Sequence, residues 1–282
     1  MMETQQVMAH WSAVAKAYHQ TESPLHPSAE DIAIMERLVQ QAATWVQPTA
    51  LSPQRQALLL GVTPQIATMQ WPPGTSLLAV DSAEGMVHSV WPGDQPGVRQ
   101  AKLGDWLALP VADAACWLVI GDGSFNCLEF PTKFQALAAA VARVLPVGGG
   151  LVLRVYVQPA RRPTPAELYA ALLAGHFHTF DGFKFLLNLS LVDEQFNVAV
   201  REVWCHWAQA KLDQEAVLHV NGWSAERFAT IAYYENSPAR YSFPPLSAVE
   251  CALADHFEKV ASVVPTYPLG ECCPILLLRK RM

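Results

Sequence analysis

Charged residues are scarce in this chain, and none of them form a long basic stretch. Asp, Glu, Lys and Arg make up 16% of the 282 residues, and the net charge at pH 7 is −6. Neighbouring basic residues occur at Arg161-Arg162 and at Arg279-Lys280-Arg281, a pattern typical of solvated segments. A protein that binds nucleic acid needs a basic face for the phosphates. The composition therefore argues against a nucleic-acid partner.

Long uninterrupted apolar runs are also missing. The longest apolar region, residues 136–157, contains Arg143, Pro146, Arg154 and three glycines. A helix that spans a bilayer needs about 20 predominantly apolar residues. The first residues, Met1-Met2-Glu3-Thr4-Gln5-Gln6, have neither the basic nor the apolar segment of a secretory signal. We therefore expect a cytoplasmic protein that has no membrane partner.

The cysteines do not form a Cys-x-x-Cys pair. The neighbouring Cys272-Cys273 pair has poor geometry for a mutual disulfide. We expect reduced, buried thiols, as in cytosolic proteins. The six cysteines are at positions 116, 127, 205, 251, 272 and 273.

Motifs of several enzyme classes are absent: Gly-x-Ser-x-Gly, the P-loop, His-Glu-x-x-His and the Ca²⁺ loop. Hydrolase and nucleotide triphosphatase functions therefore lack support. His176-Phe177-His178, with Asp181 nearby, suggests a metal site, since alternate residues of an extended segment point the same way. No third ligand follows at a suitable spacing, because Cys205 and His206 are distant in sequence. We expect no metal.

Apolar runs and helical patterns alternate over residues 56–157. In residues 131–145, Phe134, Leu137 and Val141 recur at helical spacing, and Pro146 follows. Nearly continuous apolar strands joined by helices indicate a parallel sheet that is covered on both faces. The predicted strands are residues 57–61, 76–81, 98–101, 115–120 and 151–157.

Two further strands are predicted at residues 257–264 and 274–279. The roughly ten residues between them are too few for a parallel crossover, so they should pair antiparallel. The predicted fold is α/β: a doubly wound, mostly parallel seven-stranded sheet with a C-terminal antiparallel hairpin, N-terminal helices and a helical insertion. The N-terminal helices are expected at residues 8–18 and 29–46.

The insertion occupies the roughly 100 residues between the fifth strand and the hairpin, where one crossover would need far fewer. It is rich in aromatic residues and suits a substrate lid beside a ligand-binding edge, although the same rings could simply pack the insertion onto the sheet. Its helices are predicted at residues 165–173, 183–191, 197–210, 224–234 and 247–257.

The ends of the first predicted strands carry a recognisable pattern. Gly61 follows the apolar run 58–60, and about twenty residues later Asp81 ends the run 77–80. A glycine after one buried strand and a carboxylate at the end of the next place a backbone gap beside a hydroxyl acceptor. That arrangement suits a nucleoside bound across the strand ends. A third point follows at Gly104-Asp105-Trp106.

The order of these features resembles the class I S-adenosylmethionine-dependent methyltransferases, over about residues 8–157 and 257–281. The resemblance implies S-adenosylmethionine as cofactor, S-adenosylhomocysteine as product and methyl transfer to a small-molecule acceptor. Members of the family usually have Gly-x-Gly-x-Gly after the first strand, where this chain has Gly61-Val62-Thr63-Pro64-Gln65.

The resemblance implies roles for the residues after the first two strands. Gly61 would leave room for the methionine part of the cofactor. Thr63 would cap a helix whose N–H groups meet the methionine carboxylate. Asp81, followed by Ser82, would accept hydrogen bonds from both ribose hydroxyls, and Met86 would lie against the adenine.

Further cofactor contacts are implied at the next strand ends. In Gly104-Asp105-Trp106 the aspartate would accept from the adenine amine, while its neighbours flank the ring. Asp122 would accept from the cationic amine of the methionine part, with Ser124 nearby, and Gly123 would leave room for the substrate. Tyr18, in a segment similar to the family's cofactor cover, would touch the cofactor carboxylate.

No catalytic residue is assigned, because holding the acceptor in line with an activated methyl group already removes much of the barrier. A general base with a pKa near the working pH would help an oxygen or nitrogen acceptor. His19, His176 and His178 are candidates on the substrate side. The identity of the acceptor and the oligomeric state stay open, and a homodimer is one option.

Two other functions remain as alternatives. The reduced glycine pattern favours an inactive cofactor-binding relative that acts as a sensor or scaffold. The acidic residue about twenty positions after a glycine also occurs in NAD-dependent oxidoreductases, but the missing Gly-x-Gly-x-x-Gly and the hairpin oppose that reading. The expected organisation is a helical cap (1–50), a cofactor-binding core (51–158), a helical substrate lid (159–255) and the hairpin (256–282).

Overall fold

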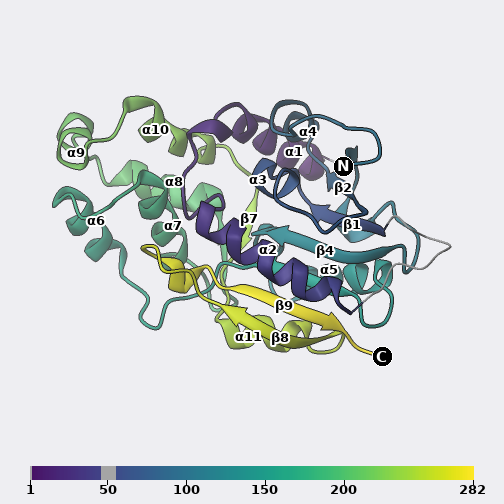
Figure 1. The fold of residues 1–282 in the computed structure, drawn as a ribbon. Coiled ribbons are helices and arrows are strands. Elements are labelled where there is room, and N and C mark those ends of the chain that lie inside the picture. Colours follow the sequence, from purple (N-terminus) through teal and green to yellow (C-terminus); the bar gives the residue numbers. More distant parts are fainter. Residues whose placement is uncertain (1, 46–54) are drawn as a thin grey trace.

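The computed structural model describes residues 2–45 and 55–282. Within them, seven strands form one sheet in the order β3-β2-β1-β4-β5-β9-β8 (Figure 1). Strands β1 to β5 pair in parallel, and β9 is antiparallel to both β5 and β8. The predicted fold class is confirmed. The strands are β1 (Arg55–Leu60), β2 (Thr75–Asp81), β3 (Arg99–Leu103), β4 (Cys116–Asp122), β5 (Gly150–Arg154), β8 (Phe257–Val263) and β9 (Ile275–Lys280).

The strand register brings the predicted site to one edge of the sheet. Leu60, the last residue of β1, pairs with Val80 in β2 and with Gly121 in β4. Because parallel strands end at the same edge, the loops after β1, β2 and β4 emerge together there.

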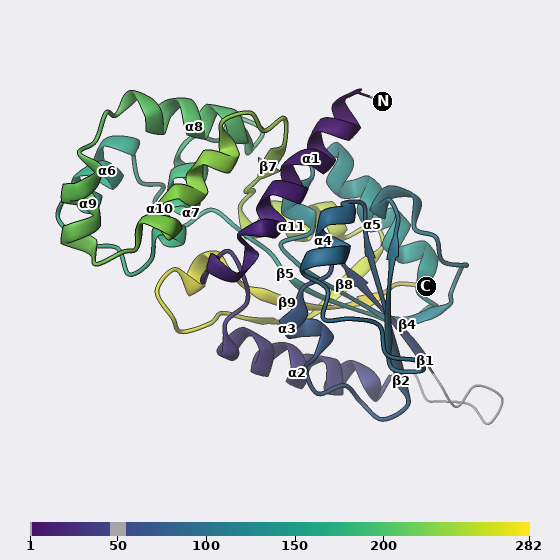
Figure 2. The same ribbon diagram turned by 90° about the horizontal axis from the view of Figure 1, so that it is seen from above.

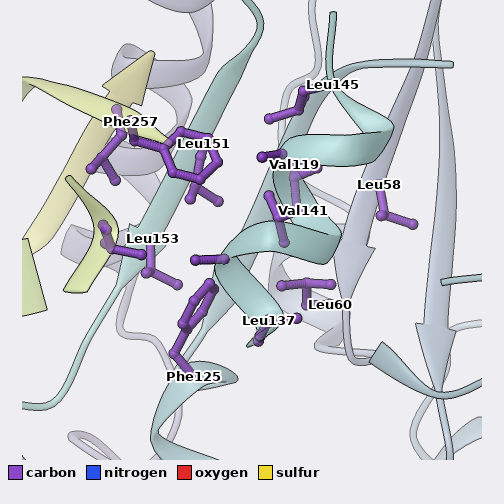
Figure 3. Packing of buried hydrophobic residues seen from close by; sticks show 14 of the residues in the cluster. Leu58, Leu60, Val119, Phe125, Leu137, Val141, Leu145, Leu151, Leu153 and Phe257 are labelled. Carbon is purple, nitrogen blue, oxygen red and sulfur yellow. The ribbon is translucent and has the colours of Figure 1, made fainter. Parts of the chain in front are cut away.

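Helices cover both faces of the sheet, and the alternation of side chains along each strand supplies a core to each face. Leu58 and Leu60 pack with α5 and α11, whereas Ala57 and Leu59 pack with α2 and α4. Figure 3 shows the first of these cores, to which β1 contributes Leu58 and Leu60 and α5 contributes Leu137 and Val141. The helices are α2 (Ala29–Ala43), α3 (Pro64–Ala67), α4 (Glu84–Ser89), α5 (Thr132–Val144) and α11 (Leu246–Leu253).

The N-terminal helix α1 (Met2–Lys16) packs against α4 at close range. A Cβ atom built on Gly85 of α4 would lie 2.8 Å from the Cα of Ser12 and 2.7 Å from its Oγ. The glycine is therefore what lets the two helices approach. Figure 2 shows α1 between α4 and the group of helices from the insertion.

The insertion has a hydrophobic core of its own, beside the sheet (Figure 2). It also contains a two-stranded antiparallel sheet that was not predicted, β6 (Asn197–Ala199) with β7 (Arg240–Ser242). The helix predicted over 197–210 consequently starts later, at Val200. The helices of the insertion are α6 (Pro165–Leu173), α7 (Phe180–Ser190), α8 (Val200–Gln209), α9 (Gln214–Asn221) and α10 (Ala225–Ala229). Helix α9 was not predicted, and α10 continues as a 3-10 turn (Thr230–Tyr234).

The division into cap, core, lid and hairpin stays a prediction, and its first boundary, at residues 50 and 51, lies outside the described residues. All six cysteines are free; Cys205 and Cys251 are exposed, so the expectation of buried thiols is wrong for these two. Among the helices of residues 2–45 and 55–282, none is long and apolar enough to cross a membrane.

Candidate functional site at the carboxyl edge of the sheet

A cavity of about 290 Å³ lies where the loops after β1, β2 and β4 meet the insertion and α1. Every predicted cofactor residue except Gly104 lines it. The predicted residues in the wall are Tyr18, Gly61, Thr63, Asp81, Ser82, Met86, Asp105, Trp106, Asp122, Gly123 and Ser124.

Gly61 continues from β1 with a backbone φ of +102°, a region that L side chains rarely adopt. A Cβ atom at this position would lie 3.8 Å from Cζ2 of Trp106 and 3.9 Å from Oδ2 of Asp81, which are ordinary contact distances. The backbone conformation, rather than crowding by neighbouring atoms, therefore requires the glycine. The same distances place Gly61 near both the indole and the carboxylate.

Asp81 ends β2 and is buried, at 8% exposure. Its Oδ1 accepts a hydrogen bond from the backbone N–H of Ala83 at 2.8 Å. Burial raises the pKa of this carboxyl to about 6, while the backbone N–H groups of Ala83 and Ser82 act in the opposite direction. The indole N–H of Trp106 donates to the carbonyl of Val80 at 2.6 Å, so the ring is held against the end of β2.

The motif after β3 divides between the cavity and the core. Asp105 is exposed on the cavity rim, and its Oδ1 accepts from the backbone N–H of Leu107 at 2.9 Å. Gly104 is outside the lining. Its Cβ would lie 3.0 Å from Cγ1 of Val80 and from Cγ of Pro110, so this glycine serves close packing.

Thr63 precedes α3, as predicted, but its side chain makes no capping hydrogen bond. Tyr18 faces the same loop, and its hydroxyl donates to Oε1 of Gln65 at 3.4 Å. Burial raises the pKa of Tyr18, so the phenol stays neutral at physiological pH. Met86, from α4, closes the wall on the side of the second core.

Asp122 ends β4 and pairs with a completely buried guanidinium. Its Oδ1 accepts from Nε of Arg154 at 2.5 Å, and Nη1 of Arg154 donates to Asp31 at 3.1 Å. Two carboxyl groups thus contact one guanidinium beside the cavity. Burial raises the pKa of Asp122, and Arg154 opposes that rise. Arg154 and Asp31 were not predicted as site residues; a lone arginine in an apolar strand was the available signal.

The next two residues differ in what they do. Gly123 has a φ of +60°, and a Cβ there would lie 2.6 Å from Cε2 of Tyr156. The room that this glycine leaves is taken by the Tyr156 ring. Ser124 is buried in the cavity wall, and its Oγ has no hydrogen-bond partner among the described residues.

The insertion supplies the opposite wall of the same cavity. Lys184 and Asn188 from α7 were not singled out by sequence reasoning, although a signal existed. Together with Asp181 they recur at positions i, i+3 and i+7, which share one face of a helix that is otherwise mostly apolar. The other lining residues of the insertion are Phe185, Thr230, Tyr233, Tyr234, Tyr241 and Phe243.

The histidines proposed on the substrate side are elsewhere. His19, His176 and His178 are exposed, and none of them lines the cavity. Searched over the described part of the chain, no group of three or more His, Cys, Asp or Glu side chains is placed to hold a metal ion.

No protein-family model matches this chain, and no curated protein is significantly similar to it. Solved structures do share its fold. A S-adenosylmethionine-dependent methyltransferase from Methanosarcina mazei is 14% identical, with a TM-score of 0.50 over 85% of this chain and 96% of that one. The CurJ carbon methyltransferase is 10% identical, with a TM-score of 0.52 over 96% of this chain and 61% of that one.

A third similar structure, from Rhodobacter sphaeroides, carries the name of a zinc-dependent alcohol dehydrogenase. It is 11% identical, with a TM-score of 0.60 over 98% of this chain and 99% of that one. Identities this low show a shared fold and nothing about shared chemistry. Together with the strand order and the reversed hairpin, the comparisons show that this chain has the class I methyltransferase fold.

Proposed function

We propose that this protein is an S-adenosylmethionine-dependent methyltransferase that acts on a small molecule. The observation that carries the proposal is one continuous cavity with two unlike walls. Residues from the ends of four neighbouring strands, β3, β2, β1 and β4, line one side, and residues from the insertion line the other. A methyl donor on the first wall would then face its acceptor on the second without intervening protein.

The charges on the first wall suit this donor. On the wall formed by the strand ends, the charged lining residues are Asp81, Asp105 and Asp122. Within the described residues, no Lys or Arg lines this wall. S-adenosylmethionine carries a cationic sulfonium and a cationic amine. Asp122 would hold the amine, and Asp81 would accept from the ribose hydroxyls, a charge-assisted contact worth about 1.5–3 kcal/mol per hydrogen bond.

When bound, S-adenosylmethionine would supply an activated methyl group, with S-adenosylhomocysteine as the leaving group. The protein's part is to hold the acceptor in line and to exclude water. Burial raises the pKa of the Cys127 thiol to about 12 and also raises the pKa of the Tyr234 and Tyr241 phenols. None of these three groups is therefore a base near neutral pH, and positioning carries the catalysis.

Calorimetric titration with S-adenosylhomocysteine tests the proposal. We expect saturable binding that is abolished or greatly weakened in Asp81→Asn, with Asp113→Asn, an exposed carboxylate outside the lining, as the matched control. NAD should not compete with S-adenosylhomocysteine. No binding of S-adenosylhomocysteine, or displacement of it by NAD, would contradict the proposal and favour an oxidoreductase.

A non-catalytic cofactor binder is the second candidate. It is favoured by the reduced glycine pattern, in which Gly61 is the only glycine of the loop after β1, and by the three lining groups whose raised pKa values rule them out as bases. The two candidates differ in turnover. Release of S-adenosylhomocysteine from S-adenosylmethionine in the presence of an acceptor identifies an enzyme, whereas binding without turnover across diverse acceptors identifies a sensor.

A further inference from the structure

Helix α7 presents a buried polar face to the cavity. Asp181, Lys184 and Asn188 are 5%, 4% and 2% exposed, and the helix is otherwise built mainly from buried phenylalanines and leucines. Lys184 and Asn188 line the cavity, and Asp181 lies behind them. Buried polar groups need hydrogen-bond partners.

Lys184 is fully engaged inside the protein. Its Nζ lies 2.6 Å from Oδ1 of Asp181, donates to Oγ1 of Thr230 at 2.8 Å and lies 5.4 Å from the centre of the Phe180 ring. The other carboxylate oxygen of Asp181 accepts from the backbone N–H of Glu22. This pair carries no net charge toward the cavity, so the wall has no counter-charge for an ionised acceptor.

Asn188 is only half satisfied. Its Nδ2 donates to the carbonyl of Lys184 at 2.7 Å, which fixes the orientation of the amide, and the side chain also hydrogen-bonds to the Tyr234 hydroxyl. Its Oδ1 is buried and has no hydrogen-bond partner within the described residues. A buried oxygen without a donor is rare in proteins, and a ligand that brings a hydroxyl or N–H would satisfy it.

Aromatic rings line the same cavity as Asn188. Phe185 packs edge to face with Phe243 at 5.9 Å between ring centres, and with Tyr156 at 5.3 Å. Tyr234 and Tyr241 complete the wall. Flat ring faces and edges in this arrangement favour a flat aromatic ligand over a branched aliphatic one.

We propose that the methyl acceptor is an uncharged aromatic molecule with a hydroxyl group, and that Oδ1 of Asn188 accepts a hydrogen bond from that hydroxyl. The proposal rests on the proposed function, since the acceptor occupies the wall that faces the methyl donor. Asn188 selects the acceptor through its hydrogen bond, while the Lys184–Asp181 pair keeps the surrounding wall neutral.

Three single-ring probes test the proposal on the unaltered protein saturated with S-adenosylhomocysteine. Phenol, anisole and benzoate share a ring but differ in the group attached to it. We expect phenol to bind about tenfold more tightly than anisole, which has lost the donor, and benzoate to bind more weakly than phenol. Equal affinities for phenol and anisole, tightest binding of benzoate, or no binding of phenol would overturn the proposal.

Substitution of the asparagine provides the second test, with a close internal control. Asn221 in α9 also donates through Nδ2 to the carbonyl four residues earlier, at 3.0 Å, and its Oδ1 also lacks a partner in the described chain. Asn221 does not line the cavity. Asn188→Leu should lower the affinity for phenol about tenfold, to that of anisole, whereas Asn221→Leu should leave both affinities unchanged.

Binding of S-adenosylhomocysteine separates this inference from the function on which it rests. If S-adenosylhomocysteine does not bind to the unaltered protein, the proposed function fails. If S-adenosylhomocysteine binds but Asn188→Leu binds phenol as tightly as the unaltered protein, the assignment of Asn188 alone fails. Should Asn188→Leu not fold, the ratio of phenol to anisole affinity in the unaltered protein still decides.

Discussion

Arg154 and Asp122 are direct neighbours across β5 and β4, and their side chains form an ion pair that is closed to solvent. The two residues are paired in the register of the strands, and Nε of Arg154 lies 2.5 Å from Oδ1 of Asp122. The exposed fractions of the two side chains are 0% and 5%. Asp31 in α2 contacts the same guanidinium, so a helix on one face is tied to the strand end at the cavity.

Removing this guanidinium should be strongly destabilising. Arg154→Met would leave Asp31 and Asp122 buried without a cation, and we expect a loss of about 3–5 kcal/mol in the free energy of unfolding. Chemical denaturation measures the change. Arg161→Met is the control, because Arg161 forms an exposed pair with Glu167 and its loss should barely shift the unfolding midpoint. Similar effects of the two substitutions would contradict the importance of the buried pair.

Affinity for S-adenosylhomocysteine should depend on pH through Asp81. The proposed contact to the ribose needs the ionised carboxylate, whose pKa in the ligand-free protein is about 6. Affinity should therefore be full above that pH and should fall as the pH drops below it. Calorimetry at about pH 8 and about pH 5 measures the difference. Asp81→Asn should bind weakly at both values, and an unchanged pH dependence in this variant would exclude Asp81 as its source.

The same raised pKa has an opposite consequence for the stability of the ligand-free protein. Because the pKa of Asp81 is higher in the folded chain than its ordinary 3.8, ionisation weakens the folded state as the pH rises from about 4 to about 6. Asp81→Asn should therefore be more stable than the unaltered protein at about pH 8, although it binds ligand poorly. Thermal unfolding without ligand measures this. A less stable variant at that pH would show that the carboxylate is structural.

Gly61 can be tested against a glycine with a similar backbone. Gly61 and Gly93 have φ values of +102° and +92°, and no atom lies within 4 Å of a Cβ placed on Gly93. Substitution by alanine at either position should cost about 1–3 kcal/mol of stability through backbone strain. Only Gly61→Ala should also reduce the affinity for S-adenosylhomocysteine, because only Gly61 lines the cavity. Equal ligand affinities in the two variants would remove Gly61 from the site.

The contact between α1 and α4 should control how the cavity is covered. Gly85→Ala would force α1 away from α4, since the added carbon meets the backbone of Ser12 as well as its side chain. We expect a loss of about 1–3 kcal/mol in stability and weaker binding of S-adenosylhomocysteine, because Trp11 and Val14 of α1 line the cavity. Unchanged stability of Gly85→Ala would argue against this close contact between the helices.

Local patterns in the chain were enough to predict the main architecture. Strands β1, β2, β4, β5 and β9 of the large sheet contain buried apolar runs, and α5 repeats its apolar residues at helical spacing. Strand ends are also local features, so Gly61, Asp81 and Asp122 could be placed at one edge before their neighbours were known. The short spacing between the last two strands required them to pair antiparallel.

Contacts between distant parts of the chain could not be read in this way. The pairing of β6 with β7 joins segments about forty residues apart, and it replaced a predicted helix start because backbone hydrogen bonds across strands outweighed local helical spacing. Arg154 meets Asp31 across more than a hundred positions, and that partner determines its burial. Gly104 and Gly123 serve packing against side chains that only folding brings near.

The spacing of Asp181, Lys184 and Asn188 was visible in the chain, but their surroundings were not. Periodicity along a helix says which residues share a face, whereas the neighbours of that face depend on how the insertion packs against the sheet. The histidines His19, His176 and His178 are the opposite case. Their side chains are suitable for acid–base chemistry, but the fold leaves them exposed and outside the cavity. Residues adjacent in the chain determine the helices, the strands and the faces of each. Packing between distant segments determines that the strand ends and the insertion meet around one cavity.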